Sequence, residues 1–271
     1  MSAVSQISLM DLFKVGSHRG NKKQKLNPKL RTFVYGSKQG LSLIDLAMMQ
    51  DSLARVEELL YNLGKTRKQI LIVGTQKHVQ GKVRELAAAM GAKGMPFINQ
   101  RWLGGTLTNW ATVKKTLKTL EKNEKILENA EFFETLSRNE QLGITRETDK
   151  LRQIFGGLVD LRSNRPGAVL VLDGENNHVA IQEADVMHIP TISLLNTASV
   201  SLPKKLDHAI VCNNNSKKLV DLLSERFVEA YNRGLGDAVE TTPAVQQNNQ
   251  GIPGGQPRPS YNNNNNQFRR N

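Results

Sequence analysis

Cysteine is nearly missing from this sequence of 271 residues, in which Cys212 is the only one. A single thiol cannot form an internal disulfide or supply a thiolate metal cluster, so we expect Cys212 to be a small buried side chain. No run approaches the roughly 18 consecutive apolar residues of a membrane-spanning helix. The first residues, 1–6, also lack a basic region followed by an apolar stretch. We therefore expect a soluble protein that is not secreted.

Acidic residues are scarce relative to basic ones. The sequence holds 37 Lys and Arg against 25 Asp and Glu, which gives a net charge of +12. This surplus favours a polyanionic partner, and nucleic acid fits better than the alternative, an anionic membrane surface. Residues 237–271 consist mainly of Asn, Gln, Pro and Gly, which cannot bury enough apolar area to offset the entropy of ordering. We predict a disordered tail there; it carries +1, so +11 belongs to the rest of the chain.

Short apolar runs rich in β-branched residues alternate with helical patterns along the chain. Apolar residues three and four positions apart between Leu46 and Leu63 predict a helix that faces a sheet. Further helices are predicted at 77–90, 179–188 and 216–231, the last followed by Gly234. This alternation is typical of an α/β protein with a mostly parallel sheet covered on both faces. The predicted strands are Leu41–Ile44, Ile70–Val73, Ala168–Leu172, Thr191–Leu195 and Ala209–Val211.

The stretch from Thr108 to about Phe155 has no strand pattern and many charged residues. Its two apolar seams are narrow, which is typical of an antiparallel helical hairpin that protrudes from the body. Surface helices lying on the main sheet are the alternative. The predicted organisation is a basic N-terminal segment at 1–38, an α/β domain in two parts at 39–107 and 158–236, a helical hairpin insertion at 108–157 and the tail at 237–271.

The segment from Lys14 to Arg31 is the clearest candidate for binding nucleic acid. Seven of its eighteen residues are basic and none is acidic, while Gly16, Gly20 and Pro28 prevent a continuous helix. An irregular basic segment can lay Lys and Arg along a phosphate backbone, whereas a merely solvated loop would be expected to mix both signs. The residues expected to bind RNA are Arg19, Lys22, Lys23, Lys25, Lys29 and Arg31.

Both tryptophans lie in the segment 99–110, on either side of a double glycine. Trp102 and Trp110 are interpreted as core aromatics, with stacking platforms for RNA bases as the alternative. Asn99 and Arg101 are interpreted as RNA-binding residues. Thr108 or Asn109 is expected to cap the following helix.

Two further segments resemble catalytic or nucleotide sites without matching them. Gly74–Lys82 follows a predicted strand, but six residues separate its glycines and Val83 replaces the Ser or Thr of a phosphate-binding loop. Lys77 and Lys82 are therefore assigned to a basic face that binds RNA. Asp173–His178, with Glu183 and Asp185 after it, lacks a Ser elbow, HExxH or CxxC, so capping and turn formation are preferred to catalysis or metal binding.

In order along the chain, these segments resemble the small-subunit ribosomal protein two family in its bacterial and organellar form. The resemblance covers about residues 7–232, and RWLGGTLTNW at 101–110 is its most specific part. The other matching segments are Gly16–Leu30, Ile72–Thr75, Gly156–Gly157, Leu172–Asp173, His178–Ala184 and Ile189–Pro190. The chain departs from the family pattern at His18–Asn21, where relatives have a glycine flanked by two histidines, and at Asn196–Lys205, where they have an acidic turn.

The resemblance implies a three-layer, Rossmann-like α/β fold with a protruding antiparallel helical hairpin. It implies a structural role in translation: binding small-subunit rRNA between the head and body of the subunit, joining late in assembly, and helping to recruit the large mRNA-binding ribosomal protein in bacteria. Neighbouring ribosomal proteins are expected partners, and the expected location is a ribosome in the bacterial cytoplasm or the mitochondrial matrix. Neither an enzymatic activity nor a cofactor, metal, membrane or small-molecule substrate is expected. The alternatives are a nucleotide-dependent enzyme on a Rossmann-like sheet and a peripheral membrane or adaptor protein.

Overall fold

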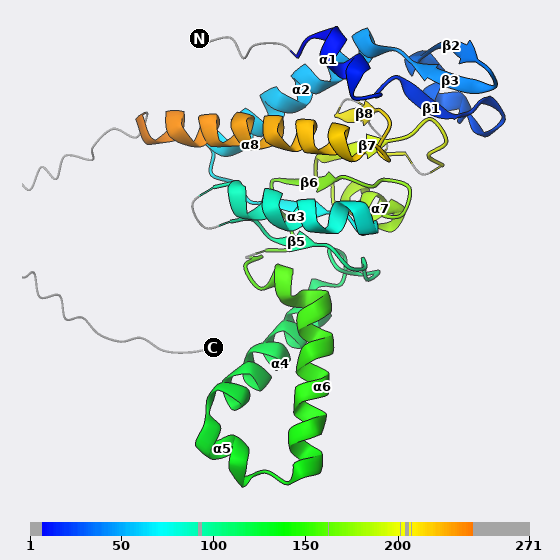
Figure 1. The fold of residues 1–271 in the computed structure, drawn as a ribbon. Coiled ribbons are helices and arrows are strands. Elements are labelled where there is room, and N and C mark those ends of the chain that lie inside the picture. Colours follow the sequence, from blue (N-terminus) through cyan, green and yellow to red (C-terminus); the bar gives the residue numbers. More distant parts are fainter. Residues whose placement is uncertain are drawn as a thin grey trace, which may run out of the picture. The chain divides into compact units, whose positions relative to one another are not determined.

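The computed structural model describes residues 7–91, 94–161, 163–200, 202–203, 206 and 208–240. Its centre is a parallel sheet of five strands in the order β5-β4-β6-β7-β8 (Figure 1). The strands are β4 (Ile70–Val73), β5 (Phe97–Ile98), β6 (Ala168–Val171), β7 (Thr191–Leu195) and β8 (Ala209–Val211). The predicted parallel sheet is thus confirmed, although the two-residue β5 was too short to leave a pattern in the sequence.

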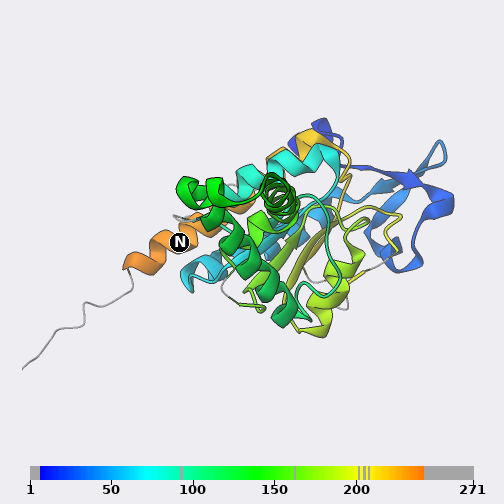
Figure 2. The same cartoon turned by 90° about the horizontal axis from the view of Figure 1, so that it is seen from below.

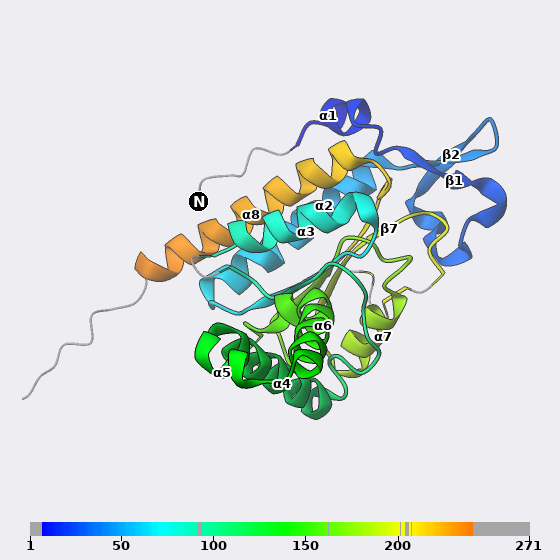
Figure 3. The same cartoon turned by 60° about the horizontal axis from the view of Figure 1, so that its bottom comes forward.

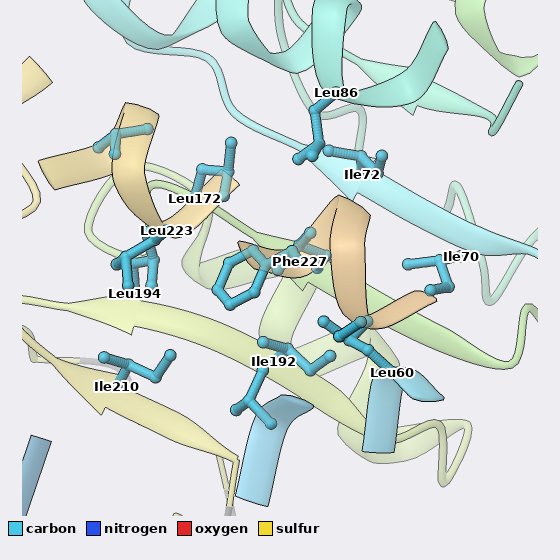
Figure 4. Close-up of a cluster of buried hydrophobic side chains, with 14 of the residues drawn as sticks. Leu60, Ile70, Ile72, Leu86, Leu172, Ile192, Leu194, Ile210, Leu223 and Phe227 are labelled. Carbon is cyan, nitrogen blue, oxygen red and sulfur yellow. The ribbon is translucent and has the colours of Figure 1, made fainter. Parts of the chain in front are cut away.

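Helices cover both faces of this sheet (Figure 3). One face carries α2 (Leu46–Lys65), α3 (Lys77–Ala89) and α8 (Lys217–Glu240), and the other carries α7 (His178–Val186). Because side chains alternate along a strand, Ile70 and Ile72 enter one core while Leu71 and Val73 enter the other. Figure 4 shows Phe227 of α8 among side chains of the first core. The short helix α1 (Leu9–Lys14) packs on α2.

Helices α4 (Trp110–Glu128) and α6 (Arg138–Phe155) run antiparallel, and α5 (Ala130–Thr135) joins them at the end far from the sheet (Figure 1). A salt bridge of 2.8 Å between Glu124 and Arg152 links the pair. Near the sheet their apolar residues join the second core, whereas α5 has no buried residue. Ser137 and Glu140 form a capping box that starts α6. Gly156–Leu158 (η3) adds a short 3-10 turn after α6.

A second, antiparallel sheet of three strands lies to one side of the main sheet (Figure 2). Its order is β1-β3-β2, with β1 (Arg19–Lys22), β2 (Val34–Lys38) and β3 (Leu41–Ile44). The prediction that Leu41–Ile44 belongs to the main sheet was wrong. Gln39 and Gly40 both have positive φ, 51° and 76°, which is the two-residue turn of a β-hairpin. Gln-Gly is not among the common sequences for a two-residue hairpin turn, so the sequence did not predict the hairpin.

The last helix, α8, continues past the glycine that was expected to end it. Gly234 lies inside α8. Glycine is needed there because a Cβ would overlap the carbonyl oxygen of Tyr61 in α2. The Tyr61 hydroxyl donates a hydrogen bond of 2.6 Å to Asp237, and Ala238 is buried. The predicted start of the tail at residue 237 was therefore wrong, since the helix runs to Glu240. The rest of the predicted tail, 241–271, lies outside the described residues.

Candidate nucleic-acid interface

The basic N-terminal segment is a folded element rather than an irregular loop. Between β1 and β2 it forms two 3-10 turns, Lys23–Lys25 (η1) and Pro28–Phe33 (η2). Asn27 caps the second turn by accepting a hydrogen bond of 3.0 Å from the backbone N–H of Lys29. Leu30 and Phe33 are buried against Ile44 and Val211 in a small core of their own. These two buried residues anchor the backbone, while the basic side chains of the same segment are exposed to solvent.

All six basic residues of this segment that were expected to bind nucleic acid are exposed. We call them the N-terminal basic surface: Arg19, Lys22, Lys23, Lys25, Lys29 and Arg31. Lys22 and Lys23 also line an open hollow of about 640 Å³ beside the turn at Gln39 and Gly40. The six exposed cations thus come from one strand of the small sheet and from the two 3-10 turns that follow it.

Tyr35 of β2 is a feature of the small sheet that the sequence did not reveal. Its side chain is 82% exposed, which is unusual for a tyrosine in a strand. The pairing of β2 with β3 shifts register between Val34 and Gly36, so Tyr35 occupies a β-bulge. Bulges reorient a side chain away from the regular alternation of a strand. An exposed aromatic ring can stack on an unpaired base.

The N-terminal basic surface is held to the main sheet through the loop that follows β7. The backbone N–H of Asn21 donates to Thr197 Oγ1 at 2.8 Å, and Asn27 Nδ2 donates to the carbonyl of Ser199 at 2.8 Å. A Cβ on Gly20 would lie 2.7 Å from the Thr197 methyl group, so only glycine fits there. The segment His18–Asn21 therefore contacts the loop that begins at Asn196.

Other residues expected to bind RNA lie at one edge of the main sheet. Lys77 follows β4, while Asn99 and Arg101 follow β5, so all three lie beyond the carboxyl ends of parallel strands. Lys77 and Arg101 are exposed and Asn99 is half-buried. Lys82 differs, because it lies further along α3 and forms salt bridges with Glu85 at 3.5 Å and Asp221 at 3.4 Å. Its charge is largely committed within the protein.

The carboxylates at the same edge argue against a nucleotide site. Burial raises the pKa of Asp173, and burial together with the neighbouring Asp173 raises the pKa of Glu175. The positive charge of Lys25 opposes the shift in the pKa of Glu175. In an open α/β sheet a nucleotide phosphate would bind outside these strand ends, where it would meet two acids here. Gly74 serves packing instead, since a Cβ on it would lie 2.7 Å from Val83 and 2.9 Å from Val79 of α3.

Trp102 is buried, which confirms its interpretation as a core residue. Its indole N–H donates to the carboxylate of Glu183 at 2.9 Å. The same carboxylate accepts the backbone N–H groups of Gly105, Leu107 and Thr108 at 2.7, 3.0 and 3.2 Å, and the Thr108 hydroxyl at 3.2 Å. The sequence did not point to this role of Glu183, because its partners lie far away along the chain. Trp110 begins α4 and is half-buried.

The remaining titratable candidates are structural. Cys212 is buried as expected, and burial raises its pKa to about 12, which keeps the thiol protonated. His18 stacks on Phe13 with ring centroids 4.3 Å apart, and its pKa is lowered by burial and by Arg19. Among the described residues no group of three or more His, Cys, Asp or Glu is placed to hold a metal ion. No helix in this part of the chain is long and apolar enough to cross a membrane.

The protein is an α/β protein with helices on both faces of a parallel sheet and with exposed basic residues on a small second sheet and its turns. Residues 12–234 match the family described as Ribosomal protein S2. The small ribosomal subunit protein uS2 of Parabacteroides distasonis is 33% identical over 86% of this chain and 81% of its own length. That of Amoebophilus asiaticus is 34% identical over 88% of this chain and 74% of its own. The chain belongs to the ribosomal protein S2 family, whose members are structural ribosomal proteins and not enzymes.

Proposed function

We propose that this protein binds small-subunit rRNA through the N-terminal basic surface. The observation that carries the proposal is the exposure of all six cations on the segment from β1 to η2, whose backbone is anchored by the buried side chains of Leu30 and Phe33. A folded scaffold lowers the entropy cost of bringing the side chains to phosphates. Tyr35, at its bulge, would add stacking on an unpaired base.

The family resemblance supports a more specific role. The protein would lie between the head and the body of the small subunit, join late in assembly, and bind neighbouring ribosomal proteins, including the large mRNA-binding ribosomal protein where that protein is present. It would act in the ribosomes of a bacterial cytoplasm or a mitochondrial matrix. Lys77, Asn99 and Arg101 would extend the rRNA-binding surface at the ends of β4 and β5, whereas Asp173 and Glu175 follow β6.

Replacing Lys22, Lys23 and Lys25 together by Gln tests the proposal. If about six phosphates are engaged, wild-type affinity for small-subunit rRNA should fall about a thousandfold between 50 and 200 mM salt. The triple variant should bind more weakly, and its slope of log affinity against log salt should be shallower by up to roughly 0.9 for each phosphate it no longer neutralises. Its melting temperature should stay nearly unchanged, because the three side chains are exposed.

The matched control replaces Lys114, Lys115 and Lys118, three exposed lysines on α4, by Gln, so that it has the same net charge as the triple variant. Tyr35→Ala should weaken binding without changing the salt slope, since stacking displaces no counterion. The measurement is filter binding of the full chain to rRNA across the salt series. A triple variant with the wild-type slope would show that the N-terminal basic surface does not bind phosphate.

A further inference from the structure

A cavity of about 520 Å³ opens at the edge of the main sheet where the parallel strands begin. Three loops form it, and each leads into a strand: residues 67–69 precede β4, 163–167 precede β6 and 187–190 precede β7. Because the strands are parallel, their amino ends meet at one edge. The volume falls within the range of about 300 to 1,000 Å³ that is usual for ligand sites.

The charged side chains that line this cavity are cationic. Arg67, Lys68 and Arg165 line it together with the imidazole ring of His188, and no acidic residue of the described chain does. Within the described ranges, Arg67, Lys68 and Arg165 take part in no salt bridge. Cations from the loops before β4 and β6 create a potential that favours an anion.

Two acidic residues lie close in sequence to the cavity without lining it. The backbone carbonyl of Asp185 accepts the backbone N–H of His188 at 3.2 Å. The backbone carbonyl of Asp160 accepts the side-chain N–H of Gln69 at 2.9 Å. Both residues therefore support the loops through their backbone, and neither carboxylate belongs to the cavity lining.

The backbone at this cavity adds an independent observation. Arg67 and His188 have φ values of +51° and +55°, and they are two of the three non-glycine residues with positive φ in the described chain. They end the turns that follow α2 and α7, where glycine is the usual residue. A side chain in this conformation costs free energy, and such positions cluster at binding sites. The chain keeps an arginine and a histidine there, and both line the same cavity.

We propose that this cavity binds backbone phosphate of RNA, as a second site separate from the N-terminal basic surface. The inference rests on the proposed function and deepens it, since the two surfaces would engage different stretches of rRNA. An acidic protein segment fits less well. Protein segments commonly dock by adding a strand at a sheet edge or a helix in an apolar groove, whereas this cavity lies at strand ends. Two guanidinium groups suit bidentate hydrogen bonding to phosphate.

The test replaces Arg67 and Arg165 together by Gln in the full chain. For this double variant, the slope of log affinity for small-subunit rRNA against log salt should be shallower than that of the wild type by roughly 0.9 for each phosphate that the variant no longer neutralises. The variant with Lys114→Gln and Lys115→Gln has the same net charge and should keep the wild-type slope. If both double variants change the slope equally, net charge explains the effect and the cavity is not a site. If the Arg67 and Arg165 variant keeps the wild-type slope while the triple Lys variant changes it, this inference fails and the proposed function stands.

A second measurement needs no substitution. Phenylglyoxal modifies exposed arginines, and mass spectrometry then gives the rate at Arg67 and Arg165 with and without rRNA. We expect rRNA to slow modification of both residues several-fold, and poly-glutamate of equal charge to do so weakly. Equal protection by both polymers, or protection by poly-glutamate alone, would overturn the assignment to RNA. A wild-type protein that binds no rRNA at all would overturn the proposed function together with this inference.

Discussion

At the scale of single residues, Glu183 explains how the segment between Trp102 and Thr108 is held. A buried carboxylate is costly unless hydrogen bonds replace its hydration. Glu183 accepts an indole N–H, three backbone N–H groups and a hydroxyl, all from that one segment. The loop therefore folds around a side-chain carboxyl group supplied by α7, and it leads into α4, which packs in the second core. Four residues of the segment 101–110, namely Trp102, Gly105, Leu107 and Thr108, thus share one acceptor.

Replacing Glu183 by Ala should lower the free energy of unfolding by about 3 to 5 kcal/mol, because it leaves several buried donors without an acceptor. Urea denaturation measures the change. The control is Gln182→Ala, which alters the exposed neighbour on the same helix and should cost less than about 0.5 kcal/mol. Similar stabilities for the two variants would contradict the role assigned to Glu183.

At the scale of elements, two glycines set how closely α2 and α8 approach. A Cβ on Gly64 would overlap the carbonyl oxygen of Tyr231, and one on Gly234 would overlap that of Tyr61. Each helix thus touches the backbone of the other where a side chain would hold them apart. Glycine is unfavourable in a helix interior by about 1 kcal/mol relative to alanine. Close packing of the first core offsets that cost.

Gly234→Ala should therefore destabilise the protein by about 1 to 3 kcal/mol, since the added methyl group forces α2 and α8 apart. Gly236→Ala is the matched control two residues further along α8, where nothing lies within 4 Å of the added Cβ. It should leave stability unchanged or raise it by up to about 1 kcal/mol. Thermal melting compares the two variants, and a stable Gly234→Ala protein would show that the helices can separate freely.

At the scale of the whole molecule, the two cationic regions proposed to bind RNA connect to opposite ends of the strands of the parallel sheet. The N-terminal basic surface attaches to the loop after β7, whereas the cavity with Arg67 and Arg165 precedes β4 and β6. Elsewhere on the body, salt bridges commit other cations, as at Lys82 and Arg226. Two separated cationic regions are suited to holding two segments of a folded RNA at a defined spacing.

Separation of the two regions predicts additive effects. A variant that combines the three lysine and two arginine replacements should weaken the binding free energy by the sum of the changes in its parents, within about 0.5 kcal/mol. Its salt slope should likewise fall by the sum of the two separate changes. Filter binding under identical salt conditions provides the measurement. A combined change far below the sum would mean that both regions bind the same stretch of RNA.

The sequence alone predicted the strands β4, β6, β7 and β8 and the helices α2, α3 and α7 to within a few residues, because burial on one or both faces imposes a local period. It also predicted the basic segment, since the charged residues can be read directly from the sequence. Its prediction that Trp102 is buried was right. These features depend on residues that are close together in the sequence, so a short stretch of sequence is enough to predict them.

Only the tertiary structure decided which sheet Leu41–Ile44 joins, where α8 ends and what Glu183 does. Each outcome depends on partners far along the chain. Arg19 and Lys22 of β1 pair with β3, and Tyr61 of α2 contacts Gly234 of α8. The segment that begins at Trp102 is hydrogen-bonded to the carboxylate of Glu183. The cavity at Arg67, Arg165 and His188 likewise exists because parallel pairing brings the amino ends of β4, β6 and β7 to one edge. Local sequence specifies elements through their period, but the pairing of distant elements is fixed by packing, which has no signature within a short window.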